Sequence, residues 1–405
     1  MKWEEFKIID IKATSDYALA TGPFGSSIGS QYFQDEGIPV IRGSNLSTEV
    51  STRLDEEGLV FISEELAKKF ERSSVKKGDL IFTCWGTINQ IGLIDERATF
   101  EKYIVSNKQM KLTPNTEVVS SLFLYYYFSR YEVQQTILSS NIGSSVPGFN
   151  LGQLKEFRVQ LPPLPTQQKI ASILSAYDDL IDNNLKRIRL LEEAAQNLYR
   201  EWFVKFRFPG WEEVGMVNGL PEGWGRTTLG ELCNLTMGQS PSSDFYNENG
   251  EGLPFHQGVT NYGDRFVSHK TYCTNETRIA DEGDILCSVR APVGRLNVTL
   301  DKIIIGRGLS AIRNKADLQS FQFYQLKNHF VQEDMIGGGT IFSSVTKKEL
   351  ESQLLVRPSK ELMKKFEWVC KPIDEQIKTL NIQNQKLKEA RDILLPRLMN
   401  GTIEI

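Results

Sequence analysis

Four polar side chains in the second half of the sequence lie beside glycine or in turns flanked by glycine and proline. They are Gln257, Asn261, Arg290 and Arg307. Arginine can donate paired hydrogen bonds to O6 and N7 of guanine, and asparagine or glutamine can pair with N6 and N7 of adenine. On projecting loops, these residue types are candidates for contact with the base edges of DNA. For Arg307, an ion pair within the protein framework is the alternative interpretation.

The first half holds a similar set of polar residues. The candidates for base contact are Arg42, Ser44, Asn45 and Lys108, and the candidates for phosphate contact are Ser26 and Ser27. For the two serines, a simple turn at the rim of the domain is the alternative. The net charge of −4 does not by itself favour nucleic acid, but the distribution of charge matters more than the sum. The stretch from Cys287 to Lys315 carries six Lys or Arg residues and one Asp.

Signatures of catalysis are missing from the sequence. There is no G-x-x-x-x-G-K-[ST] loop, and no glycine fingerprint follows a strand and opens a helix. The only Pro-Pro pair is Pro162-Pro163, so the N-P-P-aromatic or D-P-P-aromatic motif of amino-methyltransferases is absent. The run Gly337–Thr340 is interpreted as a hinge rather than a phosphate loop. The five scattered cysteines predict reduced thiols, with no zinc site or disulfide framework.

The elements that would position the candidate residues occur twice. Gly78-Asp79-Leu80-Ile81-Phe82 returns as Gly283-Asp284-Ile285-Leu286-Cys287, and Gly37–Gly43 returns as Gly252–Gly258. The matches keep their order while their offset falls by about 20 residues along the chain, a spacing far longer than solenoid repeats show. The sequence therefore predicts a duplicated domain whose first copy carries longer loops.

A long amphipathic helix follows each copy. In the first, apolar residues recur at alternating steps of four and three from Ile170 to Trp202, which is a heptad seam. The second seam, from Phe366 to Leu398, contains Asn384 and Arg391. Thr166 is expected to cap the first helix, and Pro396 to kink or end the second near Leu395. Each helix would contain about 30–36 residues and measure about 45–54 Å.

The pattern predicts that both globules are mixed α/β, with short β-rich runs between glycines and prolines. One helix is expected in each, over 120–138 and 318–335, and the aromatic run Tyr125–Phe128 is assigned to the core. The first long helix must deliver the chain to the second globule and the second must return, so they should be antiparallel, with Asn184 near Asn381–Asn384 and a pseudo-two-fold axis. The fold class is α+β. The expected domains are 1–160, 161–206 (helix), 207–358 and 359–405 (helix).

Several separate blocks of sequence resemble the specificity subunits of type I restriction-modification systems. Leu161–Ala171 looks like the motif that opens their helical spacer. Thr21–Ser27 with Gly37–Gly43 resembles one subclass of their target recognition domains. Another subclass is matched by Gly238–Ser242, Leu253–Asn261, Ser288–Gly294 and Gly306–Leu309, and the helix ends are matched by Trp202–Val204 and Leu395–Gly401. The second spacer departs from the pattern, since Arg357-Pro358-Ser359 lacks the double proline.

The resemblance implies a non-catalytic DNA-recognition subunit. Each of the two target recognition domains would bind one half of an asymmetric, split site in double-stranded DNA. The spacer helices would dock two methyltransferase subunits, which methylate adenine N6, and endonuclease subunits would join the same complex. S-adenosylmethionine, ATP and Mg would be used by these partners, with no cofactor in this chain. A cytoplasmic location is expected, since no signal peptide or membrane-length apolar segment is present.

Two other classes of function would each account for part of the sequence. A stand-alone restriction-methylation enzyme is disfavoured by the missing methyltransferase and nuclease signatures. A protein-only scaffold would account for the helices but not for two globules rich in glycine and arginine.

Overall fold

The computed structural model describes residues 3–142, 146–332 and 344–405. The run Gly337–Thr340, interpreted above as a hinge, lies outside these residues. The chain divides into two compact units, residues 1–186 with 381–405 and residues 187–380. None of the helices in the described ranges is both long and apolar enough to cross a membrane.

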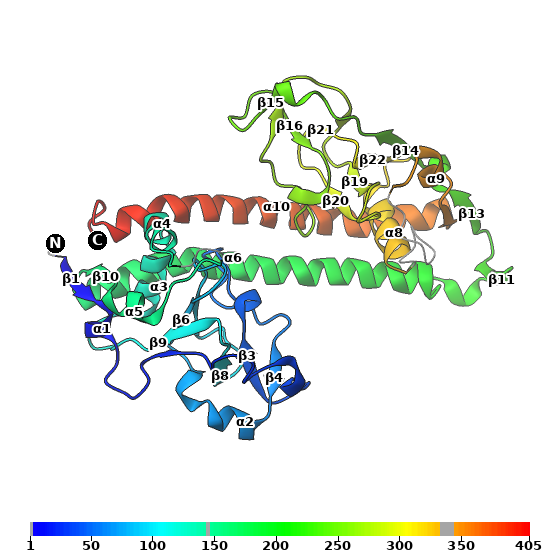
Figure 1. The fold of residues 1–405 in the computed structure, drawn as a ribbon. Helices are drawn as coiled ribbons and strands as arrows, with labels where there is room; N and C mark the ends of the chain where they lie inside the picture. Colours follow the sequence, from blue (N-terminus) through cyan, green and yellow to red (C-terminus); the bar gives the residue numbers. More distant parts are fainter. Residues whose placement is uncertain (1–2, 143–145, 333–343) are drawn as a thin grey trace. The chain divides into compact units, whose positions relative to one another are not determined.

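The globule of the first unit is built on two four-stranded sheets (Figure 1). One sheet has the order β2-β9-β6-β7 and is antiparallel throughout. The other has the order β4-β3-β8-β5, in which β3 and β8 run parallel. Their bounds are β2 Leu19–Thr21, β3 Ile38–Ile41, β4 Val60–Ile62, β5 Ser74–Val75, β6 Leu80–Thr83, β7 Ile91–Leu93, β8 Tyr103–Val105 and β9 Gln109–Leu112. A separate pair joins β1 (Glu4–Lys7) to β10 (Arg158–Leu161).

The described part of this globule also contains five short α-helices, α1 Ile8–Ile11, α2 Glu64–Lys69, α3 Ser121–Ser129, α4 Tyr131–Ser139 and α5 Leu151–Glu156. The single helix expected over 120–138 is therefore two helices, because Arg130 adopts an extended conformation between them. The prediction that Tyr125–Phe128 belongs to the core is confirmed, since each of the four side chains is at most 5% exposed.

The globule of the second unit repeats this topology. An antiparallel sheet of order β14-β22-β19-β20 lies beside one of order β15-β17-β16-β21-β18, in which β16 and β21 are parallel. The bounds are β14 Cys233–Met237, β15 Tyr246–Asn247, β16 Leu253–His256, β17 Tyr272–Cys273, β18 Ile279–Ala280, β19 Ile285–Ser288, β20 Leu296–Val298, β21 Ile303–Ile305 and β22 Leu309–Asn314. The remaining elements are β11 Met216–Val217, β12 Leu220–Pro221, β13 Gly225–Thr228, β23 Leu354–Arg357, α7 Leu229–Leu232, α8 Gln319–Gln332 and α9 Lys347–Glu351. The duplication predicted from the sequence thus holds for both sheets, with β15 as an additional strand in the second unit.

Two long helices run through both units. Helix α6 spans Leu164–Tyr199 and continues as a π-helical turn to Val204, and α10 spans Lys360–Met399. The predicted cap of α6 was wrong, and so was an end of α10 near Leu395, whereas a kink at Pro396 stays a prediction. Helix α6 begins upstream of Thr166, whose backbone N–H donates to the Pro163 carbonyl. Helix α10 passes through Pro396 and ends one turn later.

Within each unit the two helices are antiparallel. In the first unit Asp178 pairs with Arg391, and further along α6 the Nδ2 of Asn184 donates to Oδ1 of Asn384 over 2.9 Å. In the second unit Ile188 packs with Ile377 and Leu380, whereas Tyr199 contacts the ring of Phe366. Residue numbers rise along one helix as they fall along the other, so the predicted antiparallel seam and its Asn184–Asn384 contact are confirmed. The pseudo-two-fold relation of the halves stays a prediction.

Candidate nucleic-acid interface

A cluster of loops forms where the parallel strands β3 and β8 end together. Ile41 pairs with Val105, so the chain leaves both strands at the same edge of the sheet. The backbone N–H of Ser106 donates to the Ile41 carbonyl over 2.9 Å, and that of Cys84 donates to the Lys108 carbonyl over 2.6 Å. We call residues 42–44, 83–87 and 106–109 the first loop cluster. Backbone hydrogen bonds therefore join the segments that follow β3, β6 and β8.

Gly22 allows this close approach of chains. A Cβ atom there would lie 1.8 Å from the Ser106 carbonyl oxygen, and the equivalent Gly238 would place one 2.1 Å from the Gly306 carbonyl oxygen. No side chain fits at such distances, which gives a physical reason for glycine at both positions.

The first loop cluster surrounds a hollow of about 610 Å³. Its basic lining side chains are Arg42 and Lys108, and no Asp or Glu occurs among the described residues that line it. The buried side chains of Thr83 and Gln109 also line it, and the Thr83 hydroxyl and the Gln109 Nε2 have no hydrogen-bond partner within the described chain. The lining of the hollow thus combines positive charge with two buried polar atoms that have no partner in the described chain.

Three of the first-half candidates, Arg42, Ser44 and Lys108, line the hollow together. Arg42 is half-buried; its Nη2 donates to the Gly58 carbonyl over 2.8 Å, and its guanidinium lies 5.9 Å from the Phe33 ring centroid. Ser26 and Ser27 are exposed in a turn and are not among the lining residues. Asn107 ties that turn to the cluster through a 2.9 Å bond from its Nδ2 to the Gly25 carbonyl.

Asn45 requires a correction. Its side chain is fully buried, its Nδ2 donates to the carbonyls of Asp55 and Glu57, and its Oδ1 accepts from the backbone N–H of Arg42. These bonds occupy the amide on both sides, so Asn45 shapes the loop that presents Arg42 and does not itself face a ligand.

The second unit builds an equivalent cluster, residues 257–259, 288–292 and 306–309. The backbone N–H of Gly306 donates to the His256 carbonyl over 2.8 Å, and that of Val289 to the Gly308 carbonyl over 2.9 Å. These bonds match those of Ser106 and Cys84 in the first unit. They make Gln257 the structural equivalent of Arg42, and Arg307 that of Asn107.

Arg290 has an equivalent that the sequence reasoning missed. It forms an antiparallel bridge with Ser344 two residues after β19, as Trp85 does with Gly148 two residues after β6. Trp85 lines the first hollow and is 43% exposed. The repeat itself carries the signal, since the register that aligns Gly78 with Gly283 also aligns Trp85 with Arg290.

The second-half candidates are only partly gathered. The Ser240 hydroxyl donates to Oε1 of Gln257 over 2.7 Å and accepts from the backbone N–H of Arg307 over 3.2 Å, so it holds these two residues together. Arg307 is exposed and forms no ion pair with any described residue, which contradicts the framework alternative. Asn261 ends the short turn Val259–Asn261, and no side-chain hydrogen bond joins it to the other candidates in the described ranges.

A buried histidine precedes Gln257. The imidazole Nε2 of His256 lies 3.0 Å from Nδ1 of His269, whose Nε2 lies 2.9 Å from Asp301. Burial, together with the neighbouring His269, lowers the pKa of His256 to about 4. His256 is therefore neutral at pH 7, and its positive charge is not part of the cluster.

Each globule is attached to the long helices by a buried arginine. In the first unit Arg53 contacts Tyr126 and Asp178, and Asp178 also pairs with the buried Arg391 over 2.8 Å. In the second unit Nη2 of Arg265 donates to Asp374 over 2.8 Å, and the Tyr324 hydroxyl donates to the same oxygen. Burial alone would lower the pKa of Arg265, but Asp374, Tyr324 and Glu192 more than offset it and raise that pKa.

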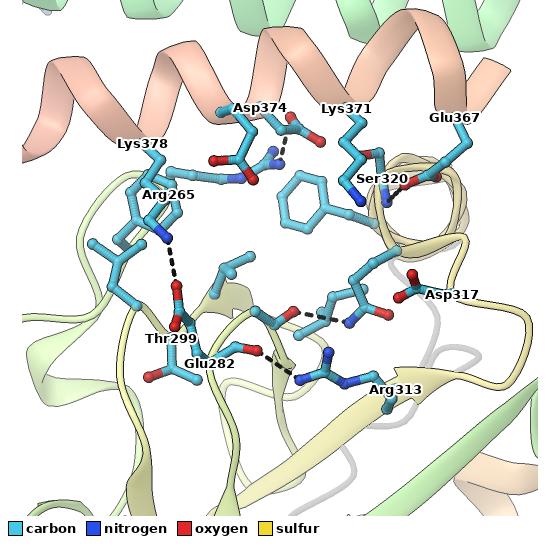
Figure 2. A pocket seen from close by; sticks show the side chains of 18 residues that line it. Arg265, Glu282, Thr299, Arg313, Asp317, Ser320, Glu367, Lys371, Asp374 and Lys378 are labelled. Atoms are coloured by element: carbon cyan, nitrogen blue, oxygen red, sulfur yellow. Dashed lines mark hydrogen bonds and ion pairs between the residues drawn. The ribbon is translucent and has the colours of Figure 1, made fainter.

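Figure 2 shows the hollow of about 270 Å³ beside this second network. Its charged side chains are largely paired within the protein: Lys378 with Glu282, Arg313 with Asp284, and Glu367 with backbone N–H groups of Ser320 and Phe321. No group of three or more His, Cys, Asp or Glu residues in the described ranges could hold a metal ion. We therefore interpret this hollow as part of the contact between α10 and the globule of the second unit.

Comparison with known proteins gives a consistent result. The sequence model described as "Type I restriction modification DNA specificity domain" matches residues 2–193 and 221–389. A protein of Methanocaldococcus jannaschii named as the MjaX specificity subunit of a type I restriction enzyme is 29% identical, over 91% of this chain and 88% of its own. The MjaIX specificity subunit of the same organism is 25% identical, over 98% and 94%. The crystal structure of a type I restriction-modification S subunit from M. genitalium has a TM-score of 0.62 and 15% identity, covering 98% of this chain and 96% of that one, and so supports the fold.

Proposed function

Because this chain belongs to the type I restriction-modification DNA specificity family, we propose that its two loop clusters bind the two halves of a split, asymmetric DNA site. The observation that carries the proposal is the duplicated cluster with different side chains at equivalent positions. Arg42 is replaced by Gln257, and arginine and glutamine favour guanine and adenine respectively. One framework presented with two sets of side chains would select two different half-sites.

Affinity and sequence selection would come from different atoms. The serines near residue 26 suit phosphate oxygens, which supply salt-dependent affinity without sequence information. The candidates for base contact are Arg42, Ser44, Lys108, Gln257, Asn261, Arg290 and Arg307. The hollow of the first unit, lined by two cations and no described carboxylate, is the kind of surface that a polyanion requires.

The long helices would dock two adenine-N6 methyltransferase subunits, and translocating endonuclease subunits would join through that complex. Apolar side chains that face solvent along α6 and α10 support a docking role, among them Leu180, Leu190, Trp368 and Ile393, each at least half exposed. This chain would contribute no catalytic group. The partners would use S-adenosylmethionine, ATP and Mg, and the complex would work in the cytoplasm.

Methylation sequencing of the host genome tests the proposal. Deleting the gene should abolish adenine methylation at one bipartite motif, and restoring the wild-type chain should restore it. Replacing residues 1–160 with the corresponding region of a related subunit should change one half of the motif and leave the other half and the gap intact. A motif that survives the deletion, or two halves that change together, would contradict the proposal.

The isolated chain provides the control for catalysis. Incubated with labelled S-adenosylmethionine and DNA, it should transfer no methyl group until methyltransferase subunits are added. Methylation by the chain alone would instead support the stand-alone enzyme.

A further inference from the structure

We propose that Trp85 is a sequence-determining residue of the first recognition domain, and that its indole contacts the methyl group of a thymine in the major groove. The inference rests on the proposed DNA-binding function. It assigns to one side chain a base that this residue type can recognise.

The position of Trp85 is the first argument. It lies two residues beyond β6, on the lining of the same hollow as Arg42 and Lys108. Its structural equivalent in the other unit is the exposed Arg290, a residue type that contacts guanine. A framework position that carries an exposed arginine in one copy and an exposed tryptophan in the other points outward toward a ligand in both.

The way the indole is held is the second argument. The neighbouring Cys84 is fixed by backbone bonds to Lys108 and Phe149, of 2.6 and 2.9 Å. The ring lies against Gly148 so closely that a Cβ on that glycine would come within 2.4 Å of it. Trp85 is nevertheless 43% exposed and has no aromatic partner among the described rings. A large apolar ring held in one place and left in water loses little conformational entropy on binding.

The chemistry of base edges selects the target. An indole offers one N–H donor and an otherwise apolar surface. Among the groups that base pairs present in the major groove, the apolar one is the C5 methyl of thymine. The polar side chains of Arg42, Ser44 and Lys108 line the same hollow and can donate hydrogen bonds to adjacent bases. Trp85 therefore suits a thymine methyl, and the residues around it suit the bases next to that thymine.

The experiment removes the methyl group from the DNA and the indole from the protein. The complex of this chain with its methyltransferase subunits is titrated, at one fixed salt concentration, with cognate duplexes in which each thymine of the first half-site is replaced singly by deoxyuridine. For the wild-type chain, one replacement should weaken binding about fourfold, as expected for the loss of one buried methyl group. Trp85→Ala should weaken binding to the unmodified site and abolish the difference at that position only. Trp85→Phe should retain it.

The control variant is Trp211→Ala. Trp211 is 45% exposed, close to the value for Trp85, but lies outside both loop clusters. It should give the wild-type deoxyuridine profile. Identical profiles for wild type and Trp85→Ala, or no sensitive thymine in the half-site, would overturn the inference.

The same titration separates this inference from the proposed function. If Arg42→Ala and Lys108→Ala weaken binding while the deoxyuridine profile ignores Trp85, the assignment of Trp85 is wrong and the DNA-binding function stands. If none of these variants alters binding or the methylated motif, the assignment of the first hollow to DNA is wrong as well.

Discussion

Replacement of Asp374 by alanine should destabilise the second unit more than any exposed substitution on the same helix. Arg265 is only 5% exposed, and Asp374 is the one described carboxylate that accepts a hydrogen bond from it. The nearest oxygen of Glu192 lies 3.9 Å away. The Tyr324 hydroxyl also donates to Asp374. Alanine would leave a buried guanidinium and a buried hydroxyl without their acceptor.

The expected loss in free energy of unfolding follows from the hydrogen bonds that Arg265 and Tyr324 would lose. Removing one partner of a buried ion pair costs about 3–5 kcal/mol. Asp374 itself is 18% exposed, so water can partly replace it, and the loss should fall near the lower end, about 3 kcal/mol. Asp374→Asn retains an acceptor but loses the charge, and should cost about half as much. A double variant with leucine at both Arg265 and Asp374 leaves no unpaired charge. Its loss in free energy of unfolding should be smaller, by about 2 kcal/mol, than the sum of the losses for the two single variants.

The assay must report on one unit, because a chain of two units need not unfold in a single step. Hydrogen exchange of α8 and of the α10 segment 360–380 gives the local free energy of opening. Glu375→Ala is the matched control, since Glu375 is exposed and adjacent on the helix; its effect should stay within about 0.5 kcal/mol. If Asp374→Ala changes the opening free energy no more than this control, the buried network does not hold the globule to the helix as described.

Three further outcomes are expected. His256 has a pKa of about 4 in the fold against an ordinary 6.5. Its contribution to the free energy of unfolding of the second unit is therefore complete above pH 6.5 and is lost as the pH falls toward 4. The second unit should lose about 2 kcal/mol at pH 5, and His256→Ile, which copies the equivalent Ile41, should flatten that slope in a pH series of unfolding. Deleting 181–187 together with the facing 381–387 removes about 10 Å of helix, or about three base pairs, so methylation sequencing should show a shorter gap or no methylation; normal methylation of the unchanged site would refute a spacer role. Arg290→Ala should weaken binding to the cognate site by about 1–3 kcal/mol, measured against single base-pair variants; equal loss on every sequence would make it a phosphate contact.

The long helices could be predicted closely because a heptad seam is a local pattern. Six of the ten positions of the seam predicted from Ile170 onward are buried and the other four are partly buried, and its polar member Asn184 meets Asn384 of the second seam. Arg391 is a charged residue on the second seam. Its Nη1 donates to Asp178, a residue 213 positions away that shows no unusual local pattern. Such long-range pairs could not be predicted from periodicity.

The globules were harder to predict for a related reason. Arg130 is extended between two helices that contribute to the same hydrophobic core, and neither glycine nor proline marks this break in the local sequence. Asn45 has the residue type of a base-contacting side chain but is used by two carbonyls about ten residues downstream. Whether a polar side chain serves the framework or the ligand depends on burial, which one sequence alone does not give.

The register of the repeat aligns some equivalent positions of the two copies but not others. Trp85 follows directly from the register of Gly78 and Gly283. The sequence offset from Asn107 to Arg307 is 200 residues. This value falls between the offsets of the neighbouring matches, because the loops of the two copies differ in length. Only the backbone bonds from Ser106 to Ile41 and from Gly306 to His256 fix that equivalence.

Those bonds also explain how two clusters on one framework can differ in sequence. The segments after β3, β6 and β8, and their counterparts in the second unit, are joined through main-chain N–H and carbonyl groups, which every residue except proline supplies in full. Side chains at the positions of Arg42, Trp85 and Asn107 can therefore change to Gln257, Arg290 and Arg307 without loss of the main-chain bonds that join the loops. The positions that must stay constant are those where a side chain has no room, such as Gly22 and Gly238. Variation in one half is then independent of the other, which is what recognition of an asymmetric site by a duplicated domain requires.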